Sequence, residues 1–262
     1  MILIHPSIDP VIFSFGVIQV RWYSLAYIFG FLIGIFLIKR INENNQNKIN
    51  NKIIDDFFIW SIIGVILGGR IGYILFYNVN TFLLNPIEIF FIWKGGMSFH
   101  GGLIGIIISM IFFSRKNSIN FFYLSDLVSI VAPIGLFLGR IANFINVELY
   151  GRITDFPFAV IYPTIDKFPR HPSQLYEALF EGLILFIILF FFNRKKIDKN
   201  SGIITGLFLI YYGIFRTLIE FLREPDSHLG LFFGFVSMGQ LLSLPLVAIG
   251  ILFYVTRKNT DD

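Results

Sequence analysis

Seven long apolar segments constrain the fold of this chain more than any other feature of its sequence. They cover residues 22–38, 57–77, 97–113, 124–141, 174–192, 203–221 and 238–255. Crossing a bilayer takes ~17–25 mostly apolar residues, and backbone groups in lipid must bond within their own segment, as in a helix. Charged residues are 15% of the chain, against about 25% in soluble domains. The sequence therefore predicts an all-α fold, a polytopic membrane protein with about seven transmembrane helices.

The whole chain, residues 1–262, is predicted to form a single integral membrane domain. Residues 1–21 are expected to be a lead-in on the outer surface, in the form of an interfacial helix. Residues 142–173 make up the largest outer segment and are rich in Phe, Ile and Tyr. We therefore expect residues 142–173 to fold into a small ordered cap.

Lysines and arginines in the loops between the apolar segments predict the orientation of the chain in the membrane. Twelve of them lie on one side: Lys39, Arg40, Lys48, Lys52, Arg115, Lys116, Arg194, Lys195, Lys196, Lys199, Arg257 and Lys258. Five lie on the other: Lys94, Arg152, Lys167, Arg170 and Arg223. The first side is expected to face the cytoplasm, which places the N-terminus outside and the C-terminus inside. The net charge of +4 reflects this bias, and no nucleic-acid partner is expected.

The chain contains no cysteine, so it can form neither a disulfide nor a thiolate metal site. Any thiol in its chemistry must arrive on a substrate. The four histidines lack the close spacing of metal ligands, and neither a cofactor nor a metal is expected. The first twenty residues lack a basic region and a signal-peptidase site, so the first apolar segment is expected to remain in the protein.

Residues 139–152 place several polar side chains at the end of an apolar segment, where a charge costs of order ~3 kcal/mol and is usually retained for a function. Arg140 and Asn143 are three residues apart, so they share a helix face. A guanidinium can grip phosphate oxygens in a bidentate manner. Asn146 can donate to the same group, and Glu148 can orient an arginine. The alternative is a buried ion pair that holds the helix to the cap.

A second candidate is His100, inside the glycine-dense stretch 95–102. Glycine permits close backbone approach, and the N-terminus of the following helix favours anions. Residues 95–102 could equally be a glycine-rich turn with a hydrogen-bonded histidine. Arginines expected at the same depth favour a functional role.

Tyr212, Arg216 and Glu220 are spaced by four and form one stripe on the sixth apolar segment. An intrahelical salt bridge between Arg216 and Glu220 explains the pair equally well. Arg223 and Glu224 are expected to be a solvated helix end.

Further predictions concern the start of the fifth helix and the glycines and arginine of the second. Ser173 is predicted to cap the fifth helix, and Glu177 suits the positive end of its dipole. Gly64, Gly68 and Gly72 recur every four residues and predict close packing against another helix. Arg70 is expected to pair with an acid or to face the site.

The polar candidates fall in the outer half of the membrane or just above it. This set comprises Tyr23, His100, Arg140, Asn143, Glu148, His171, Gln174, Glu177, Arg216, Glu220 and Gln240. A transport path needs polar groups through the whole thickness, so a one-sided cluster favours a site at the outer leaflet. Two alternatives remain: a transporter of an anionic solute, and a structural subunit whose charges are assembly ion pairs.

Together these residues resemble the prolipoprotein diacylglyceryl transferase family. The matching stretches lie in order along nearly the whole chain: residues 21–24, 69–73, 97–102, 139–152, 171–177, 215–216, Glu220 and 223–226. The resemblance implies transfer of the diacylglyceryl group of phosphatidylglycerol to the lipobox cysteine of a prolipoprotein signal peptide, with a new thioether and release of glycerol phosphate. It also implies the outer face of the bacterial inner membrane, which would make the cap periplasmic.

This reaction explains the residue types. A phosphodiester carries one negative charge, and the departing monoester approaches two, so fixed cations favour the transition state. The predicted catalytic residues are His100, Arg140, Arg216, Glu148 and Glu220. The predicted substrate-binding residues are Arg140, Asn143, Asn146, Gly151, Tyr23, Tyr212 and Arg216. His100 would act as the base for the thiol or as an orienting group, because histidine exchanges protons near neutral pH.

Overall fold

The structure is a computed structural model that describes residues 2–16, 18–44, 49–91, 95–196, 201–225 and 236–258. Lys48, Lys94, Lys199 and Asp226, used above, lie outside the described residues. The chain divides into two compact units. Unit 1 comprises residues 1–41 and 126–262, and unit 2 comprises residues 42–125.

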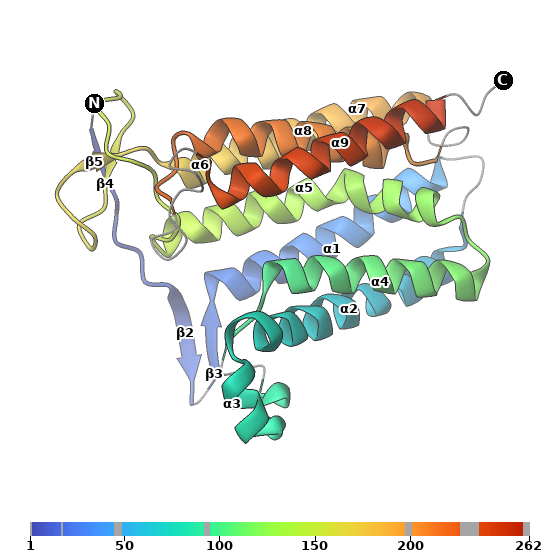
Figure 1. The fold of residues 1–262 in the computed structure, drawn as a ribbon, viewed down its shortest axis with the longest axis horizontal. Coiled ribbons are helices and arrows are strands. Elements are labelled where there is room, and N and C mark those ends of the chain that lie inside the picture. The colour runs from blue at the N-terminus through green and yellow to red at the C-terminus, as the bar shows by residue number, and fades with distance from the viewer. Residues whose placement is uncertain are drawn as a thin grey trace. The chain divides into compact units, whose positions relative to one another are not determined.

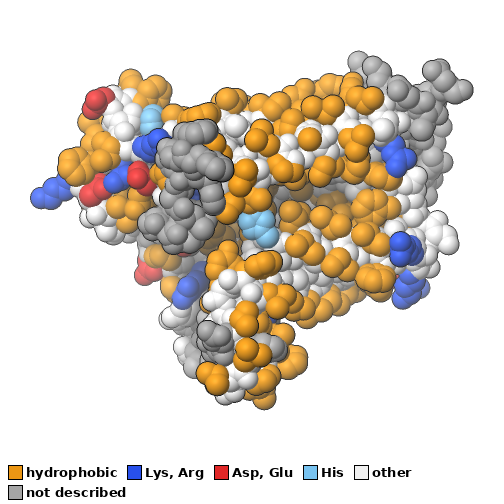
Figure 2. Space-filling view, in the orientation of Figure 1, with side chains coloured by type: hydrophobic (Ala, Val, Ile, Leu, Met, Phe, Trp, Pro, Cys, Tyr) orange, Lys and Arg blue, Asp and Glu red, His pale blue; other side chains and the backbone are white. Residues whose placement is uncertain are grey.

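All seven predicted membrane helices are confirmed within the described residues (Figure 1). They are α1 (Trp22–Glu43), α2 (Asn51–Tyr77), α4 (Phe99–Asn117), α5 (Phe121–Ile145), the continuous rod α6–η3–α7 (Ser173–Glu177, Ala178–Ile184 and Leu185–Lys196), α8 (Ile203–Glu220) and α9 (Met238–Lys258). Figure 2 shows hydrophobic side chains over most of the visible helical surface. The chain is therefore a multi-pass membrane protein.

Helix ends extend past the apolar segments because capping residues, rather than hydropathy, decide where a helix starts. The second helix begins at Asn51, six residues before the apolar segment, since the Asn50 side chain accepts a hydrogen bond from the Lys52 amide at 2.9 Å. The fourth helix, α5, starts at Phe121 and runs to Ile145. Arg140 and Asn143 therefore both lie on α5.

In unit 2, α2 packs against α4 through facing glycines, as the spacing of Gly64, Gly68 and Gly72 predicts. A Cβ atom built on Gly105 would lie 2.0 Å from the Gly64 carbonyl oxygen, and one on Gly101 would lie 2.3 Å from that of Gly68. Real Cβ atoms do not approach this closely, so only glycine permits this distance between the two helices.

Arg70 of α2 binds backbone carbonyls of the segment that follows α2 in the chain. That segment contains α3 (Val79–Leu84) and the 3-10 helix η1 (Pro86–Phe90). The guanidinium donates to the Ile89 oxygen at 3.0 Å and to the Gly95 oxygen at 2.6 Å. Arg70 thus holds Ile89 and Gly95 against α2.

In unit 1, a carboxylate on α5 caps a helix far away in sequence. Asp126 is fully buried and accepts from the Gly202 amide at 2.7 Å, the Thr205 amide at 2.7 Å and the Thr205 hydroxyl at 2.6 Å. The N-cap residue of α8, Gly202, makes no side-chain cap of its own. Asp126 therefore satisfies amides that α8 would otherwise leave unbonded.

The prediction of an interfacial helix in residues 1–21 is wrong, because three short strands form there. Strands β2 (Val11–Phe15) and β3 (Ile18–Arg21) are an antiparallel hairpin. Strand β1 (Leu3–Ile4) joins β4 (Val160–Ile161) and β5 (Pro169–Arg170) in the sheet order β1-β4-β5. The β-branched and aromatic residues of 11–15 favour strands over helix.

We predict that Gly105→Ala destabilises the α2–α4 contact by about 1–3 kcal/mol, because the added methyl group overlaps a backbone carbonyl. The matched control is Gly102→Ala on the same helix, where a Cβ would meet its nearest atom, the Val65 carbonyl oxygen, at 3.6 Å. The measurement is the thermal unfolding midpoint of the purified protein in detergent. Equal midpoints for the two variants would contradict the prediction.

Candidate active site

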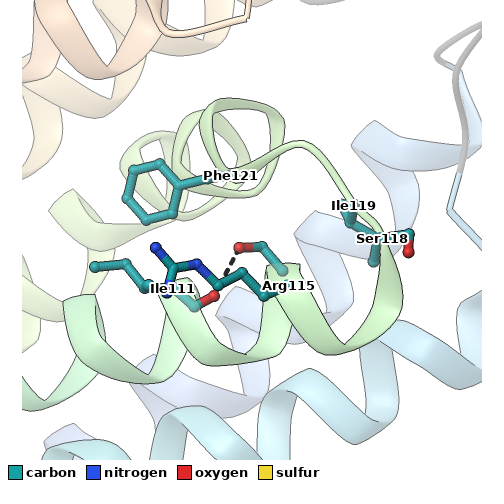
Figure 3. A pocket seen from close by; sticks show the side chains of 6 residues that line it. Ile111, Arg115, Ser118, Ile119 and Phe121 are labelled. Carbon is teal, nitrogen blue, oxygen red and sulfur yellow. Dashed lines mark hydrogen bonds between the residues drawn. The ribbon is translucent and has the colours of Figure 1, made fainter.

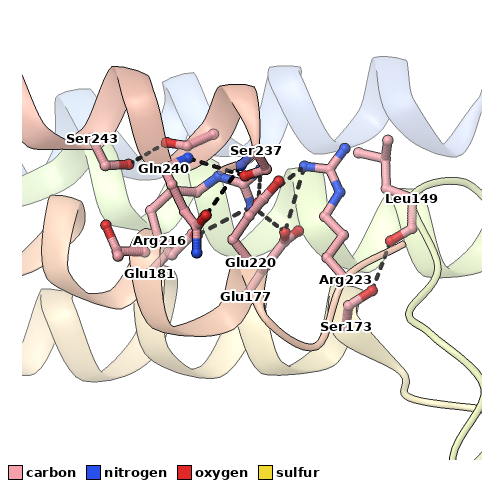
Figure 4. Close-up of polar contacts among 12 residues, drawn as sticks. Leu149, Ser173, Glu177, Glu181, Arg216, Glu220, Arg223, Ser237, Gln240 and Ser243 are labelled. Atoms are coloured by element: carbon pink, nitrogen blue, oxygen red, sulfur yellow. Dashed lines mark hydrogen bonds and ion pairs between the residues drawn. The ribbon is translucent and has the colours of Figure 1, made fainter. Parts of the chain in front are cut away.

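Six charged side chains of unit 1 gather where α5 and α8 end and α6 begins. Figure 4 shows most of this group, which we call the arginine–glutamate cluster: Arg140, Glu177, Glu181, Arg216, Glu220 and Arg223. The side chains of Glu177 and Glu181 are 0% exposed. The cluster therefore places three guanidiniums and three carboxylates in a largely water-excluded region of a membrane protein.

Two carboxylates from one helical rod hold Arg140. Its Nε lies 3.1 Å from Glu177 Oε2, and its Nη2 lies 3.2 Å from Glu181 Oε2. Glu177 ends α6, and Glu181 lies on the π-helical segment η3. The third nitrogen, Nη1, has no partner in the part of the chain that the structure describes. Arg140 thus keeps the Nη1 group free while two carboxylates fix its position.

The same two carboxylates also reach Arg216 on α8. Arg216 Nη1 lies 2.5 Å from Glu177 Oε1 and 3.8 Å from Glu181 Oε1. The Glu220 carboxylate, one turn along α8, lies 2.6 Å from Arg216 Nη2. The intrahelical salt bridge proposed from sequence therefore exists, but within a larger network.

Arg223 is buried, so the prediction of a solvated end is wrong for this residue. Its Nη1 lies 3.9 Å from Glu220 Oε2 and 4.0 Å from Glu177 Oε1. Two turn residues after α8 bring it back towards the cluster. Glu224 is 48% exposed at the side chain and pairs with Arg170 at 3.2 Å.

Burying these charges is costly, and only mutual pairing makes it tolerable. Removing one partner of a buried ion pair typically costs about 3–5 kcal/mol, because the other charge is left uncompensated. Glu177 Oε2, Glu181 Oε1 and Glu220 Oε2 lie within ion-pair distance of arginines but make no hydrogen bond. The attraction at these oxygens is therefore Coulombic.

A second polar group links the end of α5 to α1. Asn143 Nδ2 donates to the Tyr23 hydroxyl and to Glu148 Oε2, the latter at 3.0 Å. Asn146 Nδ2 donates to Glu148 Oε1 at 3.4 Å. Four of the predicted site residues thus contact one another, with Glu148 as the common acceptor for both asparagines.

The loop that carries Glu148 has a strained backbone. Val147 and Leu149 have φ values of 57° and 56°, a region that β-branched and bulky residues rarely adopt. Side chains at the start of α6 hold this loop: Gln174 donates to the Glu148 carbonyl at 2.6 Å, and Ser173 to the Leu149 carbonyl at 2.7 Å. The Ser173 hydroxyl therefore fixes the loop instead of capping α6.

Gly151 lies where three backbone segments meet. A Cβ at this position would lie 2.5 Å from the His171 carbonyl oxygen and 2.7 Å from that of Leu222. The Gly151 amide donates to the His171 carbonyl at 2.9 Å. The structure thus gives Gly151 a packing role that any side chain would disrupt.

Arg170 ties the neighbouring loop together through several contacts besides its ion pair with Glu224. It donates to Asp166 Oδ2 through Nη2 at 2.6 Å and to the Gly151 carbonyl at 3.2 Å, and it stacks over the Tyr150 ring at 5.0 Å. Hydrogen bonding from Arg170 holds the pKa of Asp166 below its usual range. Burial lowers the pKa of His171, which favours its neutral form.

The structure brings together most, but not all, of the residues predicted from sequence. Tyr212 lies on α8, one turn before Arg216, and stacks on Phe208 with ring centroids 5.8 Å apart. His100 belongs to unit 2, where it is exposed in the first turn of α4 and makes an edge contact with Phe99. All the other predicted site residues lie in unit 1.

Sequence reasoning missed Glu181 and assigned too small a role to Glu177. Both lie in the apolar segment 174–192, so the same rule that selected Arg140 would have selected them. The Gln240 side chain, expected among the convergent polar groups, forms a capping box with Ser237 instead. Its Oε1 accepts from the Ser237 amide at 3.1 Å, and the Ser237 hydroxyl accepts from the Gln240 amide at 3.2 Å.

A separate depression in unit 2 lies at the turn between α4 and α5 (Figure 3). Its lining residues are Ile111, Ser114, Arg115, Ser118, Ile119 and Phe121. The Ser114 hydroxyl donates to the Ile111 carbonyl at 3.0 Å. The lining contains one cation and no acid or histidine, so it lacks the paired groups of the arginine–glutamate cluster.

Comparison with known proteins places these features in a family. The family model described as prolipoprotein diacylglyceryl transferase matches residues 10–256. Relatives named phosphatidylglycerol–prolipoprotein diacylglyceryl transferase include those of Rickettsia typhi, 52% identical over 98% of this chain and 100% of the relative; Aeromonas hydrophila, 51% over 98% and 93%; and Vibrio vulnificus, 50% over 94% and 90%. The chain belongs to the prolipoprotein diacylglyceryl transferase family.

Proposed function

We propose that this protein transfers the diacylglyceryl group of phosphatidylglycerol to the lipobox cysteine thiol of a prolipoprotein signal peptide. The thiolate sulfur bonds to the glycerol carbon, the carbon–oxygen bond to phosphate breaks, and glycerol phosphate leaves. Membership of the family supports the reaction, and the relatives' names specify phosphatidylglycerol and prolipoprotein. The single observation that carries the mechanism is a pair of arginines, Arg216 buried and Arg140 16% exposed at the side chain, held in place by glutamates.

Arg140 and Arg216 would stabilise the charge that grows on the departing phosphate. Binding groups that favour the doubly charged product-like state over the singly charged lipid lower the barrier. Arginine suits this position because it stays protonated when desolvated. Nη1 of Arg140 and Nε of Arg216 have no partner among the described residues, so each can donate to a phosphate oxygen.

The group around Glu148 would position the lipid headgroup. Tyr23, Asn143 and Asn146 contact one another or Glu148 directly, and hydroxyls and amides of this kind can bind glycerol hydroxyls. The strained loop around Glu148 supports this proposal, because such strain tends to occur at functional sites. Gly151 would contribute by keeping its three backbone segments close.

His100 would remove the proton from the incoming thiol. A thiol must become a thiolate to attack, and histidine is the side chain suited to proton transfer near neutral pH. The exposure of His100 in the first turn of α4 leaves it accessible to a substrate. A role in orienting the substrate is the alternative for the same side chain.

We propose a location in the bacterial inner membrane, with a periplasmic N-terminus and a cytoplasmic C-terminus. The excess of lysine and arginine in one set of loops supports this orientation. Residues 142–173 would then lie on the periplasmic side within one integral membrane domain. No comparison supports the alternative of a transporter for an anionic solute.

The direct test combines the purified protein, phosphatidylglycerol and a peptide that contains a lipobox cysteine. We expect a mass increase of one diacylglyceryl group on the cysteine, together with free glycerol phosphate. A cysteine-to-serine peptide is the control and should gain no mass. Solute uptake by proteoliposomes without modification of the peptide would support a transporter instead.

Replacing Arg140 tests the phosphate-binding role. Arg140→Ala should lower transfer by at least about a hundredfold, which is the usual cost of losing one transition-state donor. Arg140→Lys should also lower it by at least about tenfold, since lysine keeps the charge but loses the planar fork. Arg115→Ala, at an exposed position of unit 2, is the control. Near-normal transfer by Arg140→Ala would refute the role.

Replacing His100 tests the base. We expect His100→Gln to lower kcat by about 10²–10⁴-fold near neutral pH. The loss should shrink as pH rises, because more of the thiol is then already ionised. The measurement is kcat against pH for the variant and the unmodified protein. Full activity across the pH range would exclude His100 as the base.

A further inference from the structure

Glu177 and Glu181 are fully buried beside the two arginines, and the proposed mechanism assigns them no role beyond holding those arginines in place. We infer that these two glutamates balance the charge of Arg140 and Arg216 so that the doubly charged leaving group, glycerol phosphate, is released. The inference rests on the proposed function, since it concerns the product of that reaction.

The contacts show that the two carboxylates act on both arginines together. Glu177 places one oxygen 2.5 Å from Arg216 Nη1 and the other 3.1 Å from Arg140 Nε. Glu181 places one oxygen 3.2 Å from Arg140 Nη2 and the other 3.8 Å from Arg216 Nη1. Each carboxylate therefore bridges both guanidiniums, and its charge reduces the attraction of both for an anion.

The charge count explains why such balance matters. With three arginines and three glutamates, the cluster is formally neutral. A cluster with excess positive charge would bind the phosphodiester more tightly, but it would bind the doubly charged product most tightly of all. Tight binding of product slows release and does not help once the substrate is bound. The acidic partners thus allow the arginines to stabilise the transition state without trapping the leaving group.

The local helix geometry supports a functional role for this pair. Segment η3 (Ala178–Ile184) is π-helical and starts directly after Glu177. Helical turns of this type are rare and often occur at functional sites. Glu177 and Glu181 lie on either side of the transition from α6 to η3, and both reach Arg140 and Arg216.

The test measures inhibition by added glycerol phosphate. Glu181→Gln removes one negative charge with little change in shape, so the inhibition constant for glycerol phosphate should fall by about tenfold or more. The kcat should fall with it, because release becomes slow, while the KM for phosphatidylglycerol should not rise. Glu181→Asp keeps the charge, so its inhibition constant should stay within about threefold of the unmodified protein.

Glu224→Gln is the matched control, because Glu224 is half-exposed and pairs with Arg170 outside the cluster. It should leave the inhibition constant unchanged. If Glu181→Gln does not fold, Glu177→Gln carries the same expectation. An unchanged inhibition constant in whichever variant folds would overturn the inference, as would equal constants for the Asp and Gln variants. Failure of the unmodified protein to transfer the lipid would instead refute the proposed function.

Discussion

The ion pairing of two arginines with two glutamates inside a membrane protein is the interaction on which the site depends. A guanidinium can be buried in a membrane protein only when neighbouring carboxylates offset the free-energy cost of its desolvation. Arg140 comes from α5, Glu177 and Glu181 from the α6–η3 rod, and Arg216 from α8. The same contacts that make the charges tolerable therefore also join three helices at one end of unit 1. The same ion pairs therefore contribute to the stability of unit 1 and fix the geometry of the site.

Polar connections extend from this arrangement in two directions. On one side, Asn143, three residues after Arg140, links α5 to Tyr23 of α1 and to Glu148. On the other, Arg223 returns after α8 to lie near Glu177 and Glu220. The loop between α5 and α6 is itself held by Ser173 and Gln174 at the start of the rod. Backbone strain at Val147 and Leu149 persists because these side chains over-determine the loop.

Hydropathy predicts the seven helices because length and apolar content suffice to identify a span. The four-residue glycine spacing likewise predicts that α2 packs closely against another helix, since spacing alone defines a helix face, and the structure identifies that helix as α4. The partners of Glu181 and the burial of Arg223 could not be predicted in this way. A charge within an apolar segment signals a buried partner, but the partners of Glu181 lie on two other helices. Burial of Arg223 depends on a turn whose direction the sequence does not reveal. Strands β2 and β3 were missed although the β-branched and aromatic residues of 11–15 favour a strand. Strand β1 was missed because its partner, β4, lies far along the chain.

Asp126 has a consequence for the order in which the chain assembles during synthesis. Its carboxylate accepts hydrogen bonds from the amides of Gly202 and Thr205, which lie 76 and 79 positions later in the chain. When α8 emerges, α5 is already made, so the acceptor for the first turn of α8 exists before that turn does. If α8 entered the membrane without such an acceptor, the amides of its first turn would be left without hydrogen bonds at the membrane boundary. The first turn of α8 thus completes its hydrogen bonding only by contact with a helix that is synthesised earlier.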